Sequence, residues 1–409
     1  MFDVGFTPDG NLLARASTDG TARVWEALTG RPVSPPLPLG AMAWTLAISP
    51  DGRWLTGNIE NLASALWLAR WKACRQLRTE QPSIDWSPQS QADWHDRQAL
   101  AFESADDRQA EIWHLDRLVE RQPRNPQILR RRGRAYDKVG QPGKAIMDLR
   151  AAIDLDPADE SAWSSRGLVE LDSGQVDSAI ADLNKALELA PEHWLALANR
   201  GIARGRKGAT ATAVDDLSQA LRIVPDETRF LKERARLYQA LGFAKKALAD
   251  FEQIVEIDPA EPGAHNDLAW FLATVLDASL RDPQRAAVLA RKAVQLAPGA
   301  GGCWNTLGVA QYRRGDWKAA IEALTKSTEL SKGGDGNDWF FLAMAHWQKG
   351  GKAEARKWFD EGVAWTKDKD PKNPEFRHFW SEAAELLGQP GPPAPGPSSS
   401  ATPSVKPAD

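Results

Sequence analysis

Two histidines, His95 and His114, are the residues of this chain whose type and position could suggest a metal site. They lie in consecutive amphipathic segments, and a helical hairpin would turn the two imidazoles toward one another. Facing imidazoles could serve as metal ligands. Neither a cysteine nor a carboxylate stands beside them at metal-ligand spacing, so packed or rim histidines are the simpler interpretation.

Other catalytic signatures are weak or missing from the sequence. Gly143-Lys144 resembles the end of a phosphate-binding loop, but Ala145 occupies the position where Ser or Thr would bind magnesium. Cys303, next to Trp304 at a predicted helix start, could have a lowered thiol pKa, or could simply be a small residue where a helix begins. None of the VAIK, HRD and DFG motifs of protein kinases is found. We therefore predict a non-catalytic protein without metal or cofactor; an enzyme would have to use the histidine pair.

The elements that position these residues repeat with a fixed period. Residues 160–191 carry small residues and a proline whose types return after a shift of 34 residues in either direction. Gly167, for example, corresponds to Gly133 and Gly201, and Pro191 corresponds to Pro157 and Pro225. Each unit reads as two amphipathic helices, with a glycine ending the first helix and a proline ending the second.

This pattern resembles the tetratricopeptide repeat family, whose period is 34 residues. The resemblance implies a mainly α fold, a right-handed α-solenoid of about eight helix pairs that stack on their neighbours. We expect the solenoid over residues 92–371, with regular repeats starting at Pro126, Glu160, Trp194 and Thr228. A fifth repeat starts near Pro262 and carries an insertion, LDASLRDP, between its two helices.

Two further segments are predicted at the C-terminus. Residues 372–388 read as a capping helix that hides the last apolar face of the solenoid. Residues 389–409 are rich in Pro and Ser with almost no large apolar side chains, which predicts disorder.

The resemblance also implies a binding site, because peptides bind this family in the groove lined by the first helix of each pair. Groove positions lie three to four residues apart and so share one helix face. Arginine can bind a carboxylate or phosphate through two hydrogen bonds, an amide both donates and accepts, and exposed aromatic and Met side chains form anchor pockets. The candidate groove residues are Arg130, Arg134, Lys232, Arg236, Asn266, Trp270, Asn305, Tyr312, Phe340, Met344 and Trp347.

These residues make the groove basic in its first half and rich in amide, aromatic and Met side chains in its second. We expect the ligand to be an extended or helical protein segment with acidic and apolar residues. The alternative is structural: the arginines could form a solvated face, and the last aromatic residues could pack against the capping helix.

Residues 1–70 read as short strands with a different period. The motif FTPDG returns 42 residues later as ISPDG, and the segment STDGTARVW is a turn followed by an alternating strand. This resembles WD40 propeller sequence over one to two blades, too few to close a ring. We expect a partial propeller segment that another chain could complete; a small open sheet is the alternative. Residues 71–91 show no period and read as a linker.

WD40 sequence followed by tetratricopeptide repeats is similar to the C-terminal part of large bacterial signalling proteins, in which a kinase domain often precedes the propeller. The favoured hypothesis is a non-catalytic protein-interaction scaffold. The alternative is the detached regulatory or substrate-recruiting end of a bacterial Ser/Thr protein kinase system.

Bulk properties limit the remaining classes. The net charge of the 409-residue chain is −4, which makes nucleic acid an improbable partner. Two distant cysteines argue against a disulfide framework and suit a reducing compartment. The first residues lack the features of a signal peptide and there is no run of 18 apolar residues, so a cytoplasmic location without membrane insertion is expected.

Overall fold

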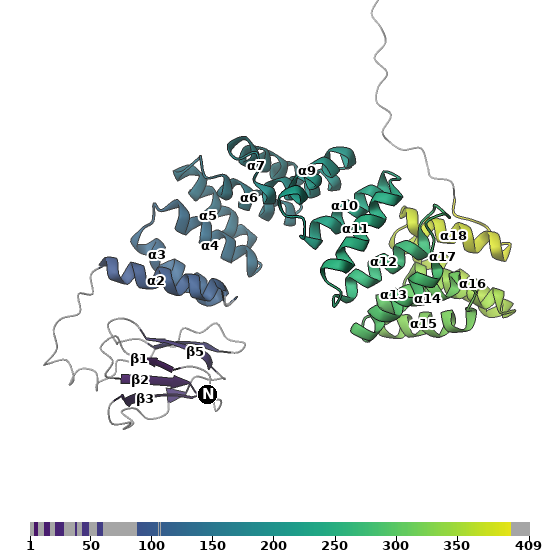
Figure 1. Ribbon diagram of the computed structural model, residues 1–409, viewed down its shortest axis with the longest axis horizontal. Helices are drawn as coiled ribbons and strands as arrows, with labels where there is room; N and C mark the ends of the chain where they lie inside the picture. The colour runs from purple at the N-terminus through teal and green to yellow at the C-terminus, as the bar shows by residue number, and fades with distance from the viewer. Residues whose placement is uncertain are drawn as a thin grey trace, which may run out of the picture. The chain divides into compact units, whose positions relative to one another are not determined.

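The computed structural model describes residues 4–6, 12–16, 21–27, 37–38, 43–48, 55–59, 88–104, 106 and 108–393. The chain divides into two compact units, Met1–Gly208 and Ala209–Asp409, and each is considered by itself (Figure 1). Most of the predicted linker and residues 394–409 of the predicted disordered tail lie outside the described residues.

The N-terminal strands form two antiparallel sheets. Four strands follow one another in the order β1-β2-β3-β4, and β5 pairs with β6. Leu12 and Ala14 of β2 are buried while Leu13 between them is partly exposed, as the alternation of a strand requires. The strands are β1 (Val4–Phe6), β2 (Leu12–Ala16), β3 (Thr21–Glu26), β4 (Leu37–Pro38), β5 (Ala43–Ile48) and β6 (Leu55–Ile59).

All described elements after the strands are helices, and consecutive helices pair as antiparallel hairpins in a solenoid arrangement within each unit. The first unit contains α2 (Pro88–Ser104), α3 (Arg108–Arg121), α4 (Pro126–Lys138), α5 (Pro142–Leu155), α6 (Glu160–Asp172), α7 (Val176–Leu189) and α8 (Trp194–Arg206). The second contains α9 (Thr210–Ile223), α10 (Thr228–Ala240), α11 (Ala244–Ile257), α12 (Pro262–Thr274), α13 (Pro283–Leu296), α14 (Gly301–Arg313), α15 (Trp317–Leu330), α16 (Gly336–Gln348), α17 (Lys352–Lys369) and α18 (Pro374–Leu387).

Local sequence fixes the helix ends. The side chain of Asn125 accepts hydrogen bonds from the backbone N–H groups of Gln127 and Ile128, and Pro126 occupies the first helical position of α4. After α6, Gly174 has a φ of 78°, a left-handed conformation that suits glycine. The predicted start positions Pro126, Glu160, Trp194, Thr228 and Pro262 are the first residues of α4, α6, α8, α10 and α12.

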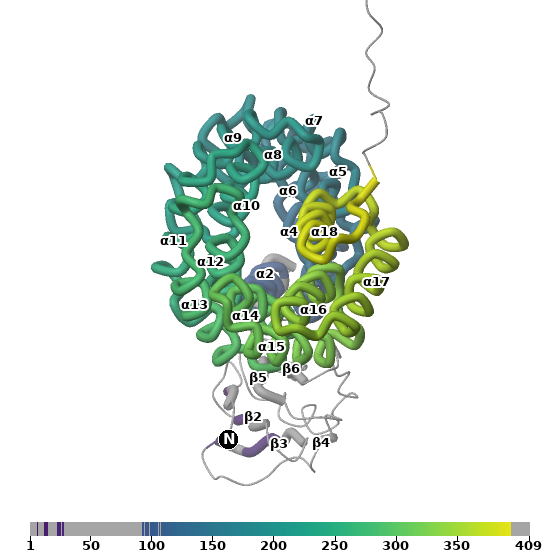
Figure 2. Tube along the Cα trace, turned by 90° about the vertical axis from the view of Figure 1, so that its right-hand side faces the viewer, coloured from purple at the N-terminus to yellow at the C-terminus, as the bar shows by residue number. Residues whose placement is uncertain are grey.

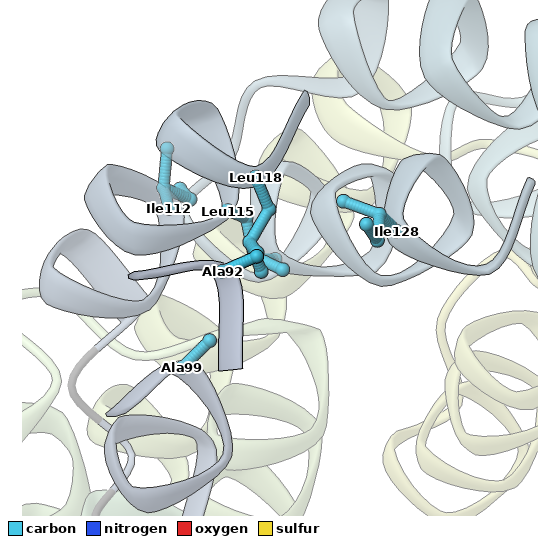
Figure 3. Close-up of a cluster of buried hydrophobic side chains, with 7 residues drawn as sticks. Ala92, Ala99, Ile112, Leu115, Leu118 and Ile128 are labelled. Atoms are coloured by element: carbon cyan, nitrogen blue, oxygen red, sulfur yellow. The ribbon is translucent and has the colours of Figure 1, made fainter. Parts of the chain in front are cut away.

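The two helices of a hairpin approach closely where a glycine faces a leucine. A Cβ atom added to Gly167 of α6 would lie 2.8 Å from Cγ of Leu183 in α7 and 3.2 Å from the carbonyl oxygen of Ala179. Between hairpins, apolar side chains form shared cores. Figure 3 shows one such cluster, in which Ala92, Ala99, Ile112, Leu115, Leu118 and Ile128 of α2, α3 and α4 are brought together.

Two predicted boundaries need correction. Helix α2 begins at Pro88, so residues 88–91 belong to the first helix and not to the linker. The proline fits there because the first helical position needs no N–H partner. The predicted disordered segment begins with residues that are hydrogen bonded: the indole Nε1 of Trp380 donates to the carbonyl oxygen of Pro390 at 3.1 Å.

The predicted capping helix is α18, and it packs against both helices of the last hairpin, α16 and α17 (Figure 2). Its buried residues are Phe379, Trp380, Ala383, Ala384 and Leu387. They follow helical spacing, so one face of α18 is apolar, while Ser381 and Glu385 on the other side are exposed.

Candidate functional site on the first helices of the repeats

The predicted basic residues of the first unit lie on α4 and differ in their surroundings. The guanidinium Nε of Arg130 lies 2.9 Å from a carboxylate oxygen of Asp159, the residue that caps the N-terminus of α6. Arg134, one turn later, is exposed. The ion pair of Arg130 therefore connects neighbouring first helices, and Arg134 is the basic side chain of this pair that faces solvent.

The second unit repeats this division on α10. The ammonium group of Lys232 pairs with the carboxylate of Asp267 in α12. Arg236 is exposed and its guanidinium lies 3.0 Å from the carboxylate of Glu233 on the same helix, a pairing that solvent weakens. Arg134 and Arg236 are thus the predicted basic residues most accessible to a ligand.

The two predicted amides are not equivalent. The side-chain Nδ2 of Asn305 in α14 donates to Asp338 of α16 at 2.7 Å, and both residues are buried. Burial raises the pKa of Asp338 to about 6. By contrast, the buried Oδ1 of Asn266 in α12 has no hydrogen-bond partner among the described residues. The side chain of Asn305 is therefore used in a hydrogen bond within the protein, whereas Asn266 has an acceptor oxygen that a ligand could use.

The expectation that Phe340 and Met344 line an open groove is wrong. Both side chains are 0% exposed. Phe340 lies in the core of the last hairpin, where its ring stacks with Trp380 of α18 at a centroid distance of 6.4 Å. Helical spacing placed these residues on one face but could not show that another helix covers that face. Trp347 is partly exposed, with the Lys352 ammonium 5.2 Å from its ring centroid.

Trp270 and Tyr312 lie on a surface that α18 crosses. The indole Nε1 of Trp270 donates to Glu375 at 2.9 Å, and its ring meets Phe379 edge-on at 6.0 Å between centroids. The ring of Tyr312 lies 5.5 Å from that of Phe341 in α16, and Phe341 contacts Phe379 at 4.9 Å. The capping helix therefore contacts α12 as well as the last hairpin.

Arg313, which was not predicted, provides the strongest polar contact on this surface. Its guanidinium donates hydrogen bonds to both carboxylate oxygens of Glu382 in α18, and the distance from Nη2 to Oε2 is 2.7 Å. The Arg313 side chain is only 13% exposed. Its guanidinium also lies 5.2 Å from the ring centroid of Phe341. The available sequence signal was the spacing of Glu375, Phe379 and Glu382, which puts two acids and an aromatic residue on one face of α18.

We call the surface formed by Asn266, Trp270, Tyr312, Arg313 and Phe341 the C-terminal A-helix face. It combines an unused amide acceptor, an indole donor, a guanidinium and aromatic rings. Such a surface suits an amphipathic helix with acidic and aromatic side chains, and α18 is a helix of that kind.

The two histidines face one another, which the sequence allowed, and they are packed residues, which was the simpler interpretation. The Nδ1 atoms of His95 in α2 and His114 in α3 lie 2.9 Å apart and both residues are buried. Burial lowers the pKa of His95 to about 4 and that of His114 to about 3. One neutral ring must donate to the other, so this pair holds α2 and α3 together above acidic pH.

Further candidates for chemistry are limited among the described residues. No group of three or more His, Cys, Asp and Glu side chains there is arranged to hold a metal ion. Burial raises the pKa of the Cys303 thiol, which corrects the possibility of a lowered one. None of the described helices combines the length and apolarity needed to cross a membrane.

Comparison with known proteins gives a family match for the helical part and no match to a curated protein. Models of the tetratricopeptide repeat match residues 127–159, 164–228, 276–335 and 306–374. Among solved structures, a tetratricopeptide repeat protein from Parabacteroides merdae is 18% identical, with a TM-score of 0.46 over 64% of this chain and 97% of the other.

Two other solved structures are also similar to the helical part of this chain. The APC/C hetero-tetramer Cut9–Hcn1 is 17% identical, with a TM-score of 0.49 over 73% of this chain and 54% of the other. YrrB, described as a tetratricopeptide repeat protein with an unusual peptide-binding site, is 17% identical, with a TM-score of 0.38 over 46% of this chain and 95% of the other. Because the family models match them, these parts of the helical region are tetratricopeptide repeats.

Proposed function

We propose that this chain is a non-catalytic scaffold that binds segments of other proteins on the face formed by the first helices of its repeats. Tetratricopeptide repeat proteins mediate protein–protein interactions, and the matched repeats supply the surface. The observation that carries the proposal is the docking of α18. An amphipathic helix with two acids and an aromatic residue seats on α12, α14 and α16 through Trp270, Arg313 and Phe341.

The expected ligand has acidic and apolar residues. Arg134 in the first unit and Arg236 in the second are exposed guanidinium groups that can bind carboxylates. Arg130 and Lys232 already form ion pairs with Asp159 and Asp267. They can therefore bind a carboxylate of a ligand mainly when it replaces the aspartate. Charge complementarity of this kind sets specificity and association rate more than affinity.

The test is capture of partners from lysate by the full chain. One variant carries Arg134→Glu and Arg236→Glu. The matched control carries Arg150→Glu and Arg222→Glu, which make the same charge change on exposed positions of second helices, α5 and α9. A discrete partner lost by the first variant and retained by the control supports the proposal. Equal capture by both would move the site away from the first helices.

We further propose that the N-terminal strands are a partial WD40 propeller. A propeller blade is a four-stranded antiparallel sheet, and β1–β4 have that order. Shifting β1 and β2 by 42 residues places them on β5 and β6, in agreement with the sequence repeat. The alternative function, a regulatory end of a bacterial Ser/Thr kinase system, depends on this interpretation. Reading the gene upstream of the Met1 codon tests it, since further in-frame blades and a kinase domain are expected there.

A further inference from the structure

Helix α18 is bound to the repeats more like a ligand than like a simple cap. A cap needs to cover only the last hairpin, and Trp380 and Phe376 do so through Phe340 of α16 and Trp365 of α17. Glu375, Phe379 and Glu382 instead reach Trp270 of α12, Arg313 of α14 and Phe341 of α16. This second set of contacts lies on the C-terminal A-helix face, where the proposed function places a partner.

The fit of α18 to this face is incomplete. The Oδ1 atoms of Asn266 and Asn337 and the Nε of Arg313 are buried and have no hydrogen-bond partner among the described residues. Asn337 interacts with Glu375 in the first turn of α18, and Asn266 lies one helical turn before Trp270, whose indole donates to the same Glu375. A buried polar atom without a hydrogen-bond partner lowers the stability of the complex that contains it. A ligand that supplied donors to the two amide oxygens would therefore bind better than α18 does.

We infer that α18 is a built-in occupant of the C-terminal A-helix face, and that a partner protein binds there by displacing it with an amphipathic helix of its own. That helix carries two acidic residues seven positions apart, one for Trp270 and one for Arg313. An aromatic residue four positions after the first acid fills the space between Trp270 and Phe341. A hydrogen-bond donor in its first turn meets Asn266 and Asn337.

This inference rests on the proposed function and adds the class of partner and its regulation. The connection between α17 and α18 is the short segment Asp370–Asn373, so α18 stays attached to the chain when it leaves the face. The free and occupied states then differ in one helix, and the repeats beneath it can keep their own hairpin contacts.

The test uses a labelled peptide of residues 374–388 as the probe and the full chain as the receptor. The chain variant Glu382→Lys removes the ion pair with Arg313 from the attached helix only, while the peptide keeps its glutamate. We expect this variant to bind the peptide at least tenfold more tightly than the unmodified chain. Glu385→Lys is the matched control, because Glu385 lies on the exposed side of α18 and the charge change is identical; it should bind like the unmodified chain.

Two further variants test the contacts that Arg313 and Trp270 make with the helix. In the otherwise unmodified chain, Arg313→Glu repels Glu382 of the attached helix and of the peptide alike, so the peptide should not bind, whereas a peptide carrying Glu382→Arg should bind. In the Glu382→Lys chain, Trp270→Phe keeps an aromatic ring but removes the N–H group that donates to Glu375. This change should weaken binding of the peptide about threefold. If the Glu382→Lys chain is folded by circular dichroism and binds the peptide no better than the Glu385→Lys chain, α18 is a fixed cap and the inference fails. The lysate experiment would still stand or fall separately, because it reads partners lost on changing Arg134 and Arg236.

Discussion

Arg166 of α6 and Asp182 of α7 form a two-pronged ion pair, with Nε and Nη2 donating to the two carboxylate oxygens at 2.5 and 2.8 Å. The same arrangement joins Arg132 to Asp148 and Arg234 to Asp250, always sixteen residues apart in sequence. Each pair links the two helices of one hairpin. The arginine is partly buried and the aspartate is almost fully buried. Each charge is therefore compensated mainly by the other and not by water.

Removing one member of this pair should destabilise the first unit. Arg166→Leu leaves Asp182 buried without its partner, and we expect a loss of about 3 kcal/mol in the free energy of unfolding. The double variant Arg166→Leu with Asp182→Leu should recover most of that loss. Urea unfolding followed by circular dichroism measures both. Arg236→Ala, which breaks an exposed pair, is the control and should change stability by about 0.5 kcal/mol or less. A single variant as stable as that control would contradict the argument.

Glu170, next to the same pair, should make stability fall as the pH rises. Burial, with the negative charge of Asp182, raises the pKa of Glu170 from 4.5 to about 7. The folded state therefore holds its proton more tightly than the unfolded state, and this stabilisation is complete below pH 4.5 and lost as the pH passes through about 7. Glu170→Gln should be more stable than the unmodified protein by about 2 kcal/mol at pH 8, with no gain near pH 4.5. The exposed control Glu192→Gln should show no such pH-dependent gain in thermal unfolding.

The histidine pair predicts the opposite dependence for α2 and α3. The folded-state pKa values, about 4 for His95 and about 3 for His114, lie below the ordinary value of 6.5. The stabilisation is present above pH 6.5 and is lost as the pH falls through those values. Hydrogen exchange in α2 and α3 should therefore accelerate from pH 7 to pH 4, after correction for intrinsic rates, by an amount equivalent to roughly 3 kcal/mol for each histidine. Replacing both histidines by leucine should flatten this response, and an unchanged slope would show that other groups cause it.

Close helix approach at Gly167 gives a steric prediction. Alanine there would bring its Cβ to 2.8 Å from Leu183, so Gly167→Ala should destabilise by about 1–3 kcal/mol. Gly143→Ala is the control, because an added Cβ there meets nothing within 4 Å. It should leave stability unchanged or slightly raised, since alanine favours helix. Thermal unfolding of the two variants compares them directly, and equal melting temperatures would refute the tight contact.

The sequence predicted what depends on neighbours within one repeat. Helices begin at Pro126, Glu160 and Trp194 because caps, prolines and glycines act locally and recur with the period. The Arg–Asp pairs could also have been found, since an arginine followed sixteen residues later by an aspartate recurs in three repeats. The contacts by which α18 covers Trp270 and Arg313 of the C-terminal A-helix face could not be predicted from the sequence. Trp270 and Glu375 are 105 residues apart, and no repeat period relates them. For Phe340 the structure agrees with the alternative stated from the sequence, that the last aromatic residues pack against the capping helix, because its ring stacks with Trp380 of α18.

The short connection Asp370–Asn373 gives α18 a further property. A helix tethered so closely to its binding surface acts at an effective concentration in the millimolar range, whatever the concentration of the protein. A partner present at about 1 μM must therefore bind the emptied face roughly a thousandfold more tightly than α18 would as a free peptide. The tether therefore sets a minimum affinity that a partner helix needs in order to displace α18, and helices that bind weakly are excluded. Substitutions in the polar contacts of α18 would lower this minimum affinity without altering the repeats.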